Sequence, residues 1–325
     1  MKNLIKMSLK IAFHEPHLTV RGTSVALYDY ARYNQELLGN ESVIILPREG
    51  VSKSDPLAMV KFVSKFRVLV YNPGNLDSVL EEEKCDVLYC IKYGKNDGIF
   101  SRKIKTVIHC VFDMSEPHGN VYAGVSSELA KKFGSSVFVP HMVSLKPSET
   151  KMNLREKLNI PGNAIVFGRY GGTDTFDLPY NWKIIKKILE VRDDVYFLFI
   201  NTPDFYHHDR ILHLPVVTDD NEKNLFINTC DAHLEAGTLG HSFGLAIAEN
   251  SINNKPVIAY TSQNLWNTAH ISILKDKAIY FSNETELYNV LFNFKPEDYT
   301  GKDLNCYRDY TPEKVMEIFR TVFLA

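Results

Sequence analysis

The chain alternates short apolar runs with amphipathic segments, and this alternation predicts its fold. Runs that are apolar on both faces, each followed by a helical pattern, are typical of a parallel sheet covered on both sides. In the first half we expect strands over Leu9–Phe13, Ser42–Leu46, Arg67–Tyr71, Asp86–Ile91, Thr106–Phe112 and Val137–Val139, and helices over Thr23–Leu38, Leu57–Phe66, Asn75–Glu83 and Ser127–Phe133. The pattern predicts an α/β fold.

The rhythm breaks at Ser144–Thr150, where proline and small polar residues indicate a linker. It then restarts, with strands expected over Ala164–Arg169, Val195–Asn201 and Pro256–Tyr260 and helices over Asn181–Glu190 and Leu245–Ile252. Leu225–Thr229 begins a further element, and elements over Ala278–Phe281 and Glu284–Phe292 complete the second unit. A length of 325 residues also favours two domains. We place them at 1–146 and 147–304. Thr311 and Pro312 have the residue types of a helix cap and first turn, so 305–325 should form a helix that packs back on the first domain.

Composition excludes several classes of protein. A hydrophobic content of 45% and a charged content of 23% are those of a soluble globular protein, and a net charge of −2 gives no electrostatic case for binding nucleic acid. The five cysteines lack zinc-ligand or redox spacing, so we expect buried thiols. Met1–Met7 does not have a signal-peptide pattern, and no apolar run approaches the ~18 residues that cross a bilayer. These features predict a cytoplasmic protein.

The segment Glu235–Glu249 is an acidic, glycine-punctuated loop that leads directly into a helix. Gly237, Gly240 and Gly244 allow the backbone to turn and to approach a ligand closely. Amides at the start of the following helix attract an anion, and Glu249 is placed to accept hydrogen bonds from sugar hydroxyls nearby. A phosphate at the helix tip and a carboxylate for hydroxyls predict a nucleotide-sugar ligand.

The same segment resembles the retaining glycosyltransferases of family 4, which have the GT-B architecture. Their signature holds two glutamates separated by seven residues within a Phe-Gly loop; here Ser242, Phe243, Gly244, Leu245 and Glu249 match it, and Lys255–Ala259 is also familiar from that family. The compact form is similar to glycosyltransferases of large DNA viruses. The resemblance implies two Rossmann-like domains with doubly wound parallel sheets that face a central cleft. It implies no cofactor and no metal, and the chain has no Asp-x-Asp motif.

The chain departs from the family signature at two positions. His241 stands where the family has its first glutamate; it could bond a sugar hydroxyl or a phosphate oxygen, and Glu235 is the nearest acidic alternative. The segment Val166–Gly172, which contains Arg169, Gly171 and Gly172, resembles the family's diphosphate-binding segment. The resemblance implies that Arg169 neutralises the charge of the leaving group. The family's lysine five residues later is replaced by Asp174, and Lys183 is a possible substitute.

Candidate residues in the first domain follow its predicted strands. Gly22 and Thr23 match a family loop that contacts phosphate or acceptor, with a simple helix start as the alternative. The resemblance implies that His109 touches the donor sugar, and the alternative is a hydrogen-bonded histidine at the edge of the core. His14 and His17 lack the spacing of a helical zinc motif, so no metal site is expected.

Together these observations predict a retaining transferase with Arg169, His109 and His241 as its catalytic residues. It would move a sugar from a UDP- or GDP-sugar donor to a glycan or another hydroxyl acceptor, in glycan biosynthesis. A nucleotide-sugar epimerase of the same fold and a non-catalytic nucleotide-sugar-binding protein remain as alternatives. A residue that only lines a cleft contributes little to the core, so Arg169→Ala should abolish turnover and leave the fold intact.

Overall fold

The protein consists of two compact units in a computed structural model that describes residues 8–325. The first comprises the described chain up to Ser144 together with Tyr310–Ala325, and the second is Leu145–Asp309. The final segment of the sequence therefore belongs to the first unit. The prediction made for Met1–Met7 concerns residues outside the described range.

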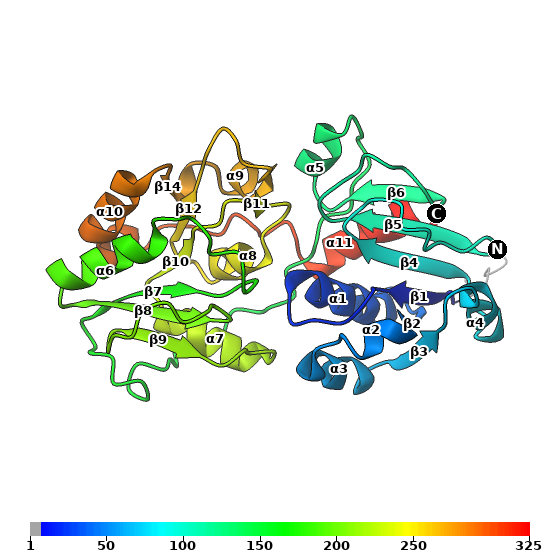
Figure 1. Cartoon of the computed structure of the whole chain (residues 1–325), viewed down its shortest axis with the longest axis horizontal. Coiled ribbons are helices and arrows are strands. Elements are labelled where there is room, and N and C mark those ends of the chain that lie inside the picture. The colour runs from blue at the N-terminus through cyan, green and yellow to red at the C-terminus, as the bar shows by residue number, and fades with distance from the viewer. Residues whose placement is uncertain (1–7) are drawn as a thin grey trace, which may run out of the picture. The chain divides into compact units, whose positions relative to one another are not determined.

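The first unit is built on a six-stranded parallel sheet with the order β3-β2-β1-β4-β5-β6 (Figure 1). This is the strand order of a doubly wound nucleotide-binding fold. Its strands are β1 Lys10–His14, β2 Glu41–Pro47, β3 Arg67–Tyr71, β4 Val87–Lys92, β5 Lys105–Cys110 and β6 Val121–Gly124. Its helices are α1 Gly22–Glu36, α2 Arg48–Val51, α3 Pro56–Val63, α4 Leu76–Glu82, α5 Ser127–Lys132, α11 Pro312–Phe319 and the π-helical turn η3 Arg320–Leu324.

The edge strand of this sheet differs from the sequence prediction. Val137–Val139 was expected to be a strand, but this segment makes only an isolated bridge, between Phe138 and Gly124. The strand that pairs with β5 is β6, which the sequence reasoning missed. A four-residue strand that ends in glycine carries a weak pattern, because it is short and only part of it is buried.

The second unit repeats the plan with the sheet order β14-β12-β10-β7-β8-β9. Its strands are β7 Ile165–Arg169, β8 Val195–Ile200, β9 Ile211–Leu214, β10 Ala232–Glu235, β12 Val257–Tyr260 and β14 Ile279–Phe281, with a small pair of β11 Gly240–His241 and β13 Asn267–Thr268. Its helices are α6 Asn181–Val191, α7 Asp220–Thr229, α8 Leu245–Ile252, α9 Ala269–Leu274, α10 Glu284–Asn293 and the short turns η1 Lys275–Lys277 and η2 Pro296–Tyr299. Strands β9 and β10 were not predicted.

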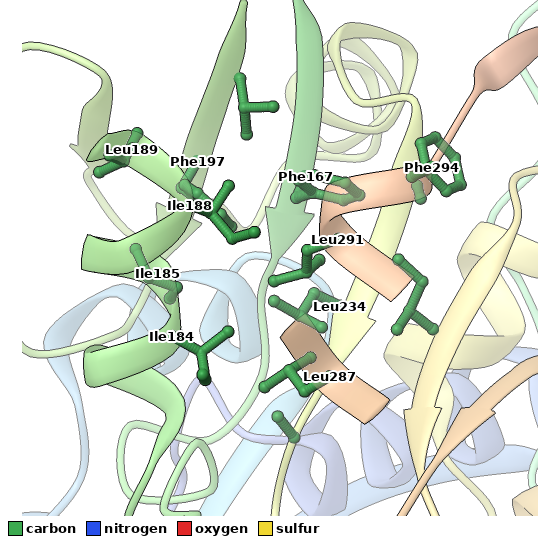
Figure 2. Close-up of a cluster of buried hydrophobic side chains, with 14 of the residues drawn as sticks. Phe167, Ile184, Ile185, Ile188, Leu189, Phe197, Leu234, Leu287, Leu291 and Phe294 are labelled. Carbon is green, nitrogen blue, oxygen red and sulfur yellow. The ribbon is translucent and has the colours of Figure 1, made fainter. Parts of the chain in front are cut away.

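Residues of β7 and β8 alternate between two apolar clusters, one on each face of the second sheet. Phe167 and Phe197 join the cluster beneath α6 and α10, whereas Val166 and Leu198 join the one beneath α7. Figure 2 shows the first cluster, in which side chains of α6 and α10 converge on Phe167, Phe197 and Leu234. Burial on both faces explains why these strands read as continuous apolar runs. The predicted fold of two doubly wound parallel sheets is confirmed.

The C-terminal helix α11 lies beside α1 in the first unit (Figure 1). Phe319 stacks on Tyr30 with ring centroids 5.3 Å apart, and Phe323 meets the edge of Tyr89 at 5.7 Å. Pro312 occupies the first helical position, as expected, but the hydroxyl of Thr311 makes no capping hydrogen bond. Aromatic packing therefore holds this helix. All five cysteines are free thiols, and four of them are buried.

Candidate functional site

The start of helix α8 has the backbone geometry that the sequence predicted. Gly244 precedes the helix with φ 88° and ψ 67°, a left-handed conformation that disfavours any residue with a side chain. No side chain among residues 8–325 caps the amides at this helix start. Phe243 anchors the loop, since its ring packs edge-on against Tyr307 at 5.4 Å and its carbonyl accepts a 3.0 Å hydrogen bond from the Tyr307 hydroxyl. Uncapped amides on a fixed loop are suited to an anion.

Glu249 lies on the same helix with its carboxylate buried and held at both oxygens. Tyr170 Oη donates to Oε2 at 2.8 Å, and Lys223 Nζ pairs with Oε1 at 2.6 Å. Tyr170 and Lys223 were missed by the sequence reasoning. Tyr170 directly follows Arg169 at the end of β7, and this position after a strand could have marked it as a site residue. Nothing in the α7 sequence singles out Lys223. A carboxylate oxygen accepts more than one hydrogen bond, so Glu249 retains capacity for a hydroxyl.

Arg169 does not line an open surface, which corrects one expectation. Its side chain is fully buried, 0% exposed. Nη1 donates to Thr202 Oγ1 at 2.6 Å, and Nη2 donates to Gly172 O and Thr175 Oγ1, each at 2.6 Å. Burial lowers the pKa of Arg169, although the negative charge of Glu235 partly opposes this. The premise that Arg169 only lines a cleft is therefore wrong, because the buried guanidinium organises several acceptors around it, and the effect of Arg169→Ala on the fold stays a prediction.

Gly171 and Gly172 belong to the loop that Arg169 holds in place. The carbonyl of Gly171 accepts a 2.7 Å hydrogen bond from Asn201 Nδ2, and Gly172 O also accepts one from Thr175 Oγ1 at 2.9 Å. These carbonyls are engaged within the unit, while the donor contacts predicted for the two glycines remain a prediction. Lys183 lies on the exposed side of α6 and pairs with Glu284 at 2.6 Å.

His241 faces a buried carboxylate that the family signature does not contain. His241 Nε2 lies 3.2 Å from Glu235 Oε1, and the His241 ring packs edge-on against His270 at 5.2 Å. Glu235 ends strand β10 and is flanked on its other side by His233, with Nε2 3.7 Å from Oε2. The sequence reasoning had noted Glu235 only as the nearest acid, and the strand that places it was not predicted.

The charge state of this cluster follows from its burial and its neighbours. Burial alone would raise the pKa of Glu235, but the charge of His241, the nearby His233 ring and the charge of Arg169 outweigh it and hold that pKa well below its usual range. Burial lowers the pKa of His233 and brings that of His270 to about 3. Glu235 is thus an anion between neutral His233 and the partly exposed His241.

Glycine at position 237 brings this cluster against the Arg169 loop. A β-carbon there would lie 2.4 Å from Thr175 O and 3.4 Å from Glu235 Oε1, so a side chain would force the two segments apart. Thr238 continues the contact, because its amide and hydroxyl both donate to Asp177, at 2.7 and 2.6 Å. The loops that follow β7 and β10 are therefore packed together at the carboxyl ends of adjacent strands.

The structure places His109 in the core of the first unit, which corrects the prediction that it touches the donor sugar. Nδ1 lies 2.6 Å from the Tyr89 hydroxyl and Nε2 lies 2.8 Å from Val139 O, so both ring nitrogens are engaged. Burial lowers the pKa of His109 to about 4, which keeps the ring neutral. The alternative of a hydrogen-bonded core histidine describes it.

Gly22 and Thr23 begin helix α1, and Gly22 is exposed. No side chain caps this helix, so its first amides are not closed off by a hydroxyl. Beside it, Glu15 follows β1 and accepts a 2.7 Å hydrogen bond from Ser24 Oγ. Burial raises the pKa of Glu15 to about 8, with the Ser24 bond partly opposing. Contact of Gly22 and Thr23 with a donor remains a prediction.

A second polar group of the first unit was missed from the sequence. His14 ends β1, with Nε2 3.0 Å from the Tyr71 hydroxyl, and the buried Lys92 ends β4, where its ammonium pairs with Asp97. These residues follow neighbouring strands at the carboxyl edge of the sheet, where open α/β sheets bind their ligands. The position of His14 directly after a strand was the available signal.

Among residues 8–325, no cluster of three or more histidine, cysteine, aspartate or glutamate side chains is arranged to hold a metal ion. Within the same range, no helix has the length and apolar content that crossing a bilayer requires.

Comparison with known proteins identifies the class of fold. Neither a protein-family model nor a curated protein sequence matches the chain. Among solved structures, Anabaena HepE in complex with UDP-glucose is similar with a TM-score of 0.73 and 14% identity, over 98% of this chain and 100% of that one. A glycosyltransferase from Rickettsia africae gives 0.63 and 14% over 97% and 94%. WaaG, a glycosyltransferase involved in lipopolysaccharide biosynthesis, gives 0.60 and 10% over 96% and 99%.

The chain has the fold of the GT-B glycosyltransferases, as its sequence predicted. At these identities the likeness concerns the fold, and function rests on the site itself.

Proposed function

We propose that the protein is a retaining glycosyltransferase that uses a nucleoside diphosphate-sugar donor and a hydroxyl-bearing acceptor such as a glycan. The donor binds to the second unit and the acceptor mainly to the first. A structural neighbour, HepE, was solved with UDP-glucose, which supports a UDP-sugar as the first donor to test.

One observation carries this proposal: helix α8 combines an uncapped start after the left-handed Gly244 with the buried carboxylate of Glu249. The helix start suits a diphosphate, because backbone amides and the helix dipole both favour negative charge there. Glu249, held by Tyr170 and Lys223, suits the hydroxyls of a ribose or sugar. A nucleotide-sugar is a ligand that carries both a diphosphate and hydroxyls.

In the proposed reaction the acceptor oxygen bonds to the anomeric carbon on the face that the diphosphate leaves. The bond from that carbon to the diphosphate oxygen breaks, and the departing phosphate takes the acceptor proton. No side chain forms a covalent intermediate. The helix-tip amides stabilise the growing phosphate charge, and losing such a donor typically costs ~3–4 kcal/mol of barrier. Arg169 acts indirectly, because its buried guanidinium holds the loop that contains Gly171 and Gly172.

The test begins with binding and proceeds to turnover. Ligand-observed NMR with UDP, GDP and their common sugars identifies the donor that binds the intact protein. That donor is then incubated with a panel of alkyl glycosides, while ³¹P NMR follows release of the nucleoside diphosphate and the ¹H anomeric coupling of the product reports its configuration. We expect product with the anomeric configuration of the donor.

Other outcomes of the same experiment contradict the proposal in distinguishable ways. Isomerised sugar formed from the donor alone would indicate an epimerase. Tight donor binding with neither transfer nor hydrolysis would indicate a recognition protein. Product with inverted configuration would retain a transferase but exclude the retaining reaction.

A further inference from the structure

The buried carboxylate of Glu235 is not used in the reaction proposed above, yet it lies against the residue that departs from the family signature. Its side chain is 5% exposed, and that of His241 is 24% exposed. The two come from different elements, since Glu235 ends β10 and His241 lies in β11. The pairing therefore depends on the fold of the intervening loop, including the close approach at Gly237.

The hydrogen-bond capacity of this pair is incomplete. Glu235 Oε1 has no well-aligned donor within residues 8–325, although His241 Nε2 is only 3.2 Å away. A buried anionic oxygen at that distance favours a proton on the facing ring nitrogen, because an unprotonated nitrogen would set two lone pairs against each other. In a neutral imidazole the other nitrogen, Nδ1, then carries the lone pair and can only accept.

We propose that Glu235 is a positioning residue that fixes the proton of His241 on Nε2, so that Nδ1 accepts a hydrogen bond from a hydroxyl of the donor sugar. This inference rests on the proposed function for the identity of the hydroxyl. It explains how a histidine serves where the resemblance implies a carboxylate. Both groups then offer an acceptor to the sugar, and the negative charge has moved from the loop to the end of β10.

The neighbouring groups support this assignment. His233 approaches the other oxygen of Glu235, at 3.7 Å, and its ring is buried. His270, from α9, contacts the His241 ring edge-on at 5.2 Å and is neutral because burial lowers its pKa to about 3. Arg169 lies in β7, on the strand paired with β10, and its positive charge favours the ionised form of Glu235. Each of these neighbours is compatible with an anionic Glu235.

The first test observes the tautomer directly and needs no donor. Long-range ¹H–¹⁵N NMR at pH 8, where an ordinary imidazole is neutral, distinguishes the two ring nitrogens of each histidine in the intact protein. The His241 signals are assigned by their loss in His241→Gln. We expect protonated Nε2 in the wild type and a shift toward protonated Nδ1 in Glu235→Gln, whose amide can donate to Nε2. A wild-type His241 protonated on Nδ1, or an unchanged tautomer in Glu235→Gln, would overturn the proposal.

The second test asks whether the acceptor is used for the sugar. Affinities of UDP and of the UDP-sugar are compared by calorimetry in the wild type, His241→Gln and Glu235→Gln. We expect the sugar's contribution to affinity to fall about tenfold in both variants, as for one lost hydrogen bond, while UDP alone binds nearly as before. Equal loss for UDP and UDP-sugar would contradict a sugar-specific role.

The control is a second histidine–carboxylate pair of the same length. His213 Nδ1 lies 3.2 Å from Asp204 Oδ1 at the surface of the same unit, so Asp204→Asn should leave both affinities unchanged. If Glu235→Gln does not fold, the wild-type spectrum and His241→Gln still decide the matter. A protein that shows the expected tautomer but binds no nucleotide-sugar would refute the proposed function while leaving the Glu235–His241 relationship intact.

Discussion

The hydroxyl of Tyr170 donates a 2.8 Å hydrogen bond to Glu249 Oε2, linking the residue that follows β7 to helix α8. Asn250 Nδ2 in turn donates to the same tyrosine oxygen at 3.3 Å. With Lys223 on the opposite carboxylate oxygen, Glu249 is fixed in orientation before any ligand arrives. Such preorganisation reduces the entropy that a ligand must lose on binding.

Replacing Glu249 should therefore weaken nucleotide binding. We expect Glu249→Gln to raise the dissociation constant of the nucleotide about tenfold or more, because a charged acceptor becomes a weaker neutral one and the ion pair with Lys223 is lost. Calorimetry with the nucleoside diphosphate measures the change. Glu284→Gln is the matched control, since Glu284 in α10 also forms a 2.6 Å ion pair, with Lys183 of α6, but this pair is exposed. An unchanged constant for Glu249→Gln would remove the residue from the binding site.

Arg169 should be needed for stability as well as for activity. Arg169→Ala removes the guanidinium that donates to the buried hydroxyl of Thr202 and to the partly buried Thr175 hydroxyl and Gly172 carbonyl. We expect a loss of ~3 kcal/mol or more in the free energy of unfolding, with Arg169→Lys between the variant and the wild type. Urea denaturation followed by fluorescence measures it. Lys183→Ala, an exposed cation, should change stability by less than ~0.5 kcal/mol.

Gly168 should not tolerate a methyl group. A β-carbon at this position would lie 2.2 Å from Cys230 Sγ and 3.0 Å from Cys230 Cβ. We expect Gly168→Ala to destabilise the protein by ~1–3 kcal/mol through overpacking. Cys230→Ala should recover part of this loss in the double variant, because it removes the sulfur atom. A double-mutant cycle with no coupling energy would show that the strain lies elsewhere.

Glu15 should make stability decrease as pH rises. Its folded-state pKa of about 8 lies above the ~4.3 of an unfolded glutamate, so between these values only the folded state keeps the proton. The stabilisation is complete below about pH 4.3 and is lost by about pH 8. Glu15→Gln should match the wild type at about pH 4 and exceed it at about pH 8.5 by at least ~1.4 kcal/mol. The exposed Glu82→Gln should behave as the wild type at both pH values in urea denaturation.

The sequence predicted the parts of the molecule that local patterns determine. Strand β3 and helix α8 have the predicted bounds. A run of branched apolar residues predicts the strand, and a glycine directly before an apolar segment predicts the start of the helix, so both depend on neighbouring residues alone. The turn at Gly244 and the place of Glu249 on α8 followed from the same segment, whereas the burial of Glu249 did not.

Long-range relationships were beyond such patterns. Lys223 meets Glu249 only because α7 and α8 pack against the same sheet, and nothing within α7 predicts that contact. His109 is a core residue because Val139 and the C-terminal aromatics cover it, and these lie far along the chain. Arg169 was correctly predicted to end a strand, but its place in the chain does not show whether its guanidinium is exposed or buried. Residues distant in the sequence, such as Thr202, determine that.

The assignment of Tyr310–Ala325 to the first unit has a practical consequence for dissecting the protein. The second unit, Leu145–Asp309, is continuous and could be produced from a single gene fragment. The first unit would require a fusion of two separate segments of the coding sequence. Stopping translation at residue 309 would strip Phe319 and Phe323 from the aromatic cluster around Tyr89, so the shortened product should misfold instead of merely losing a tail.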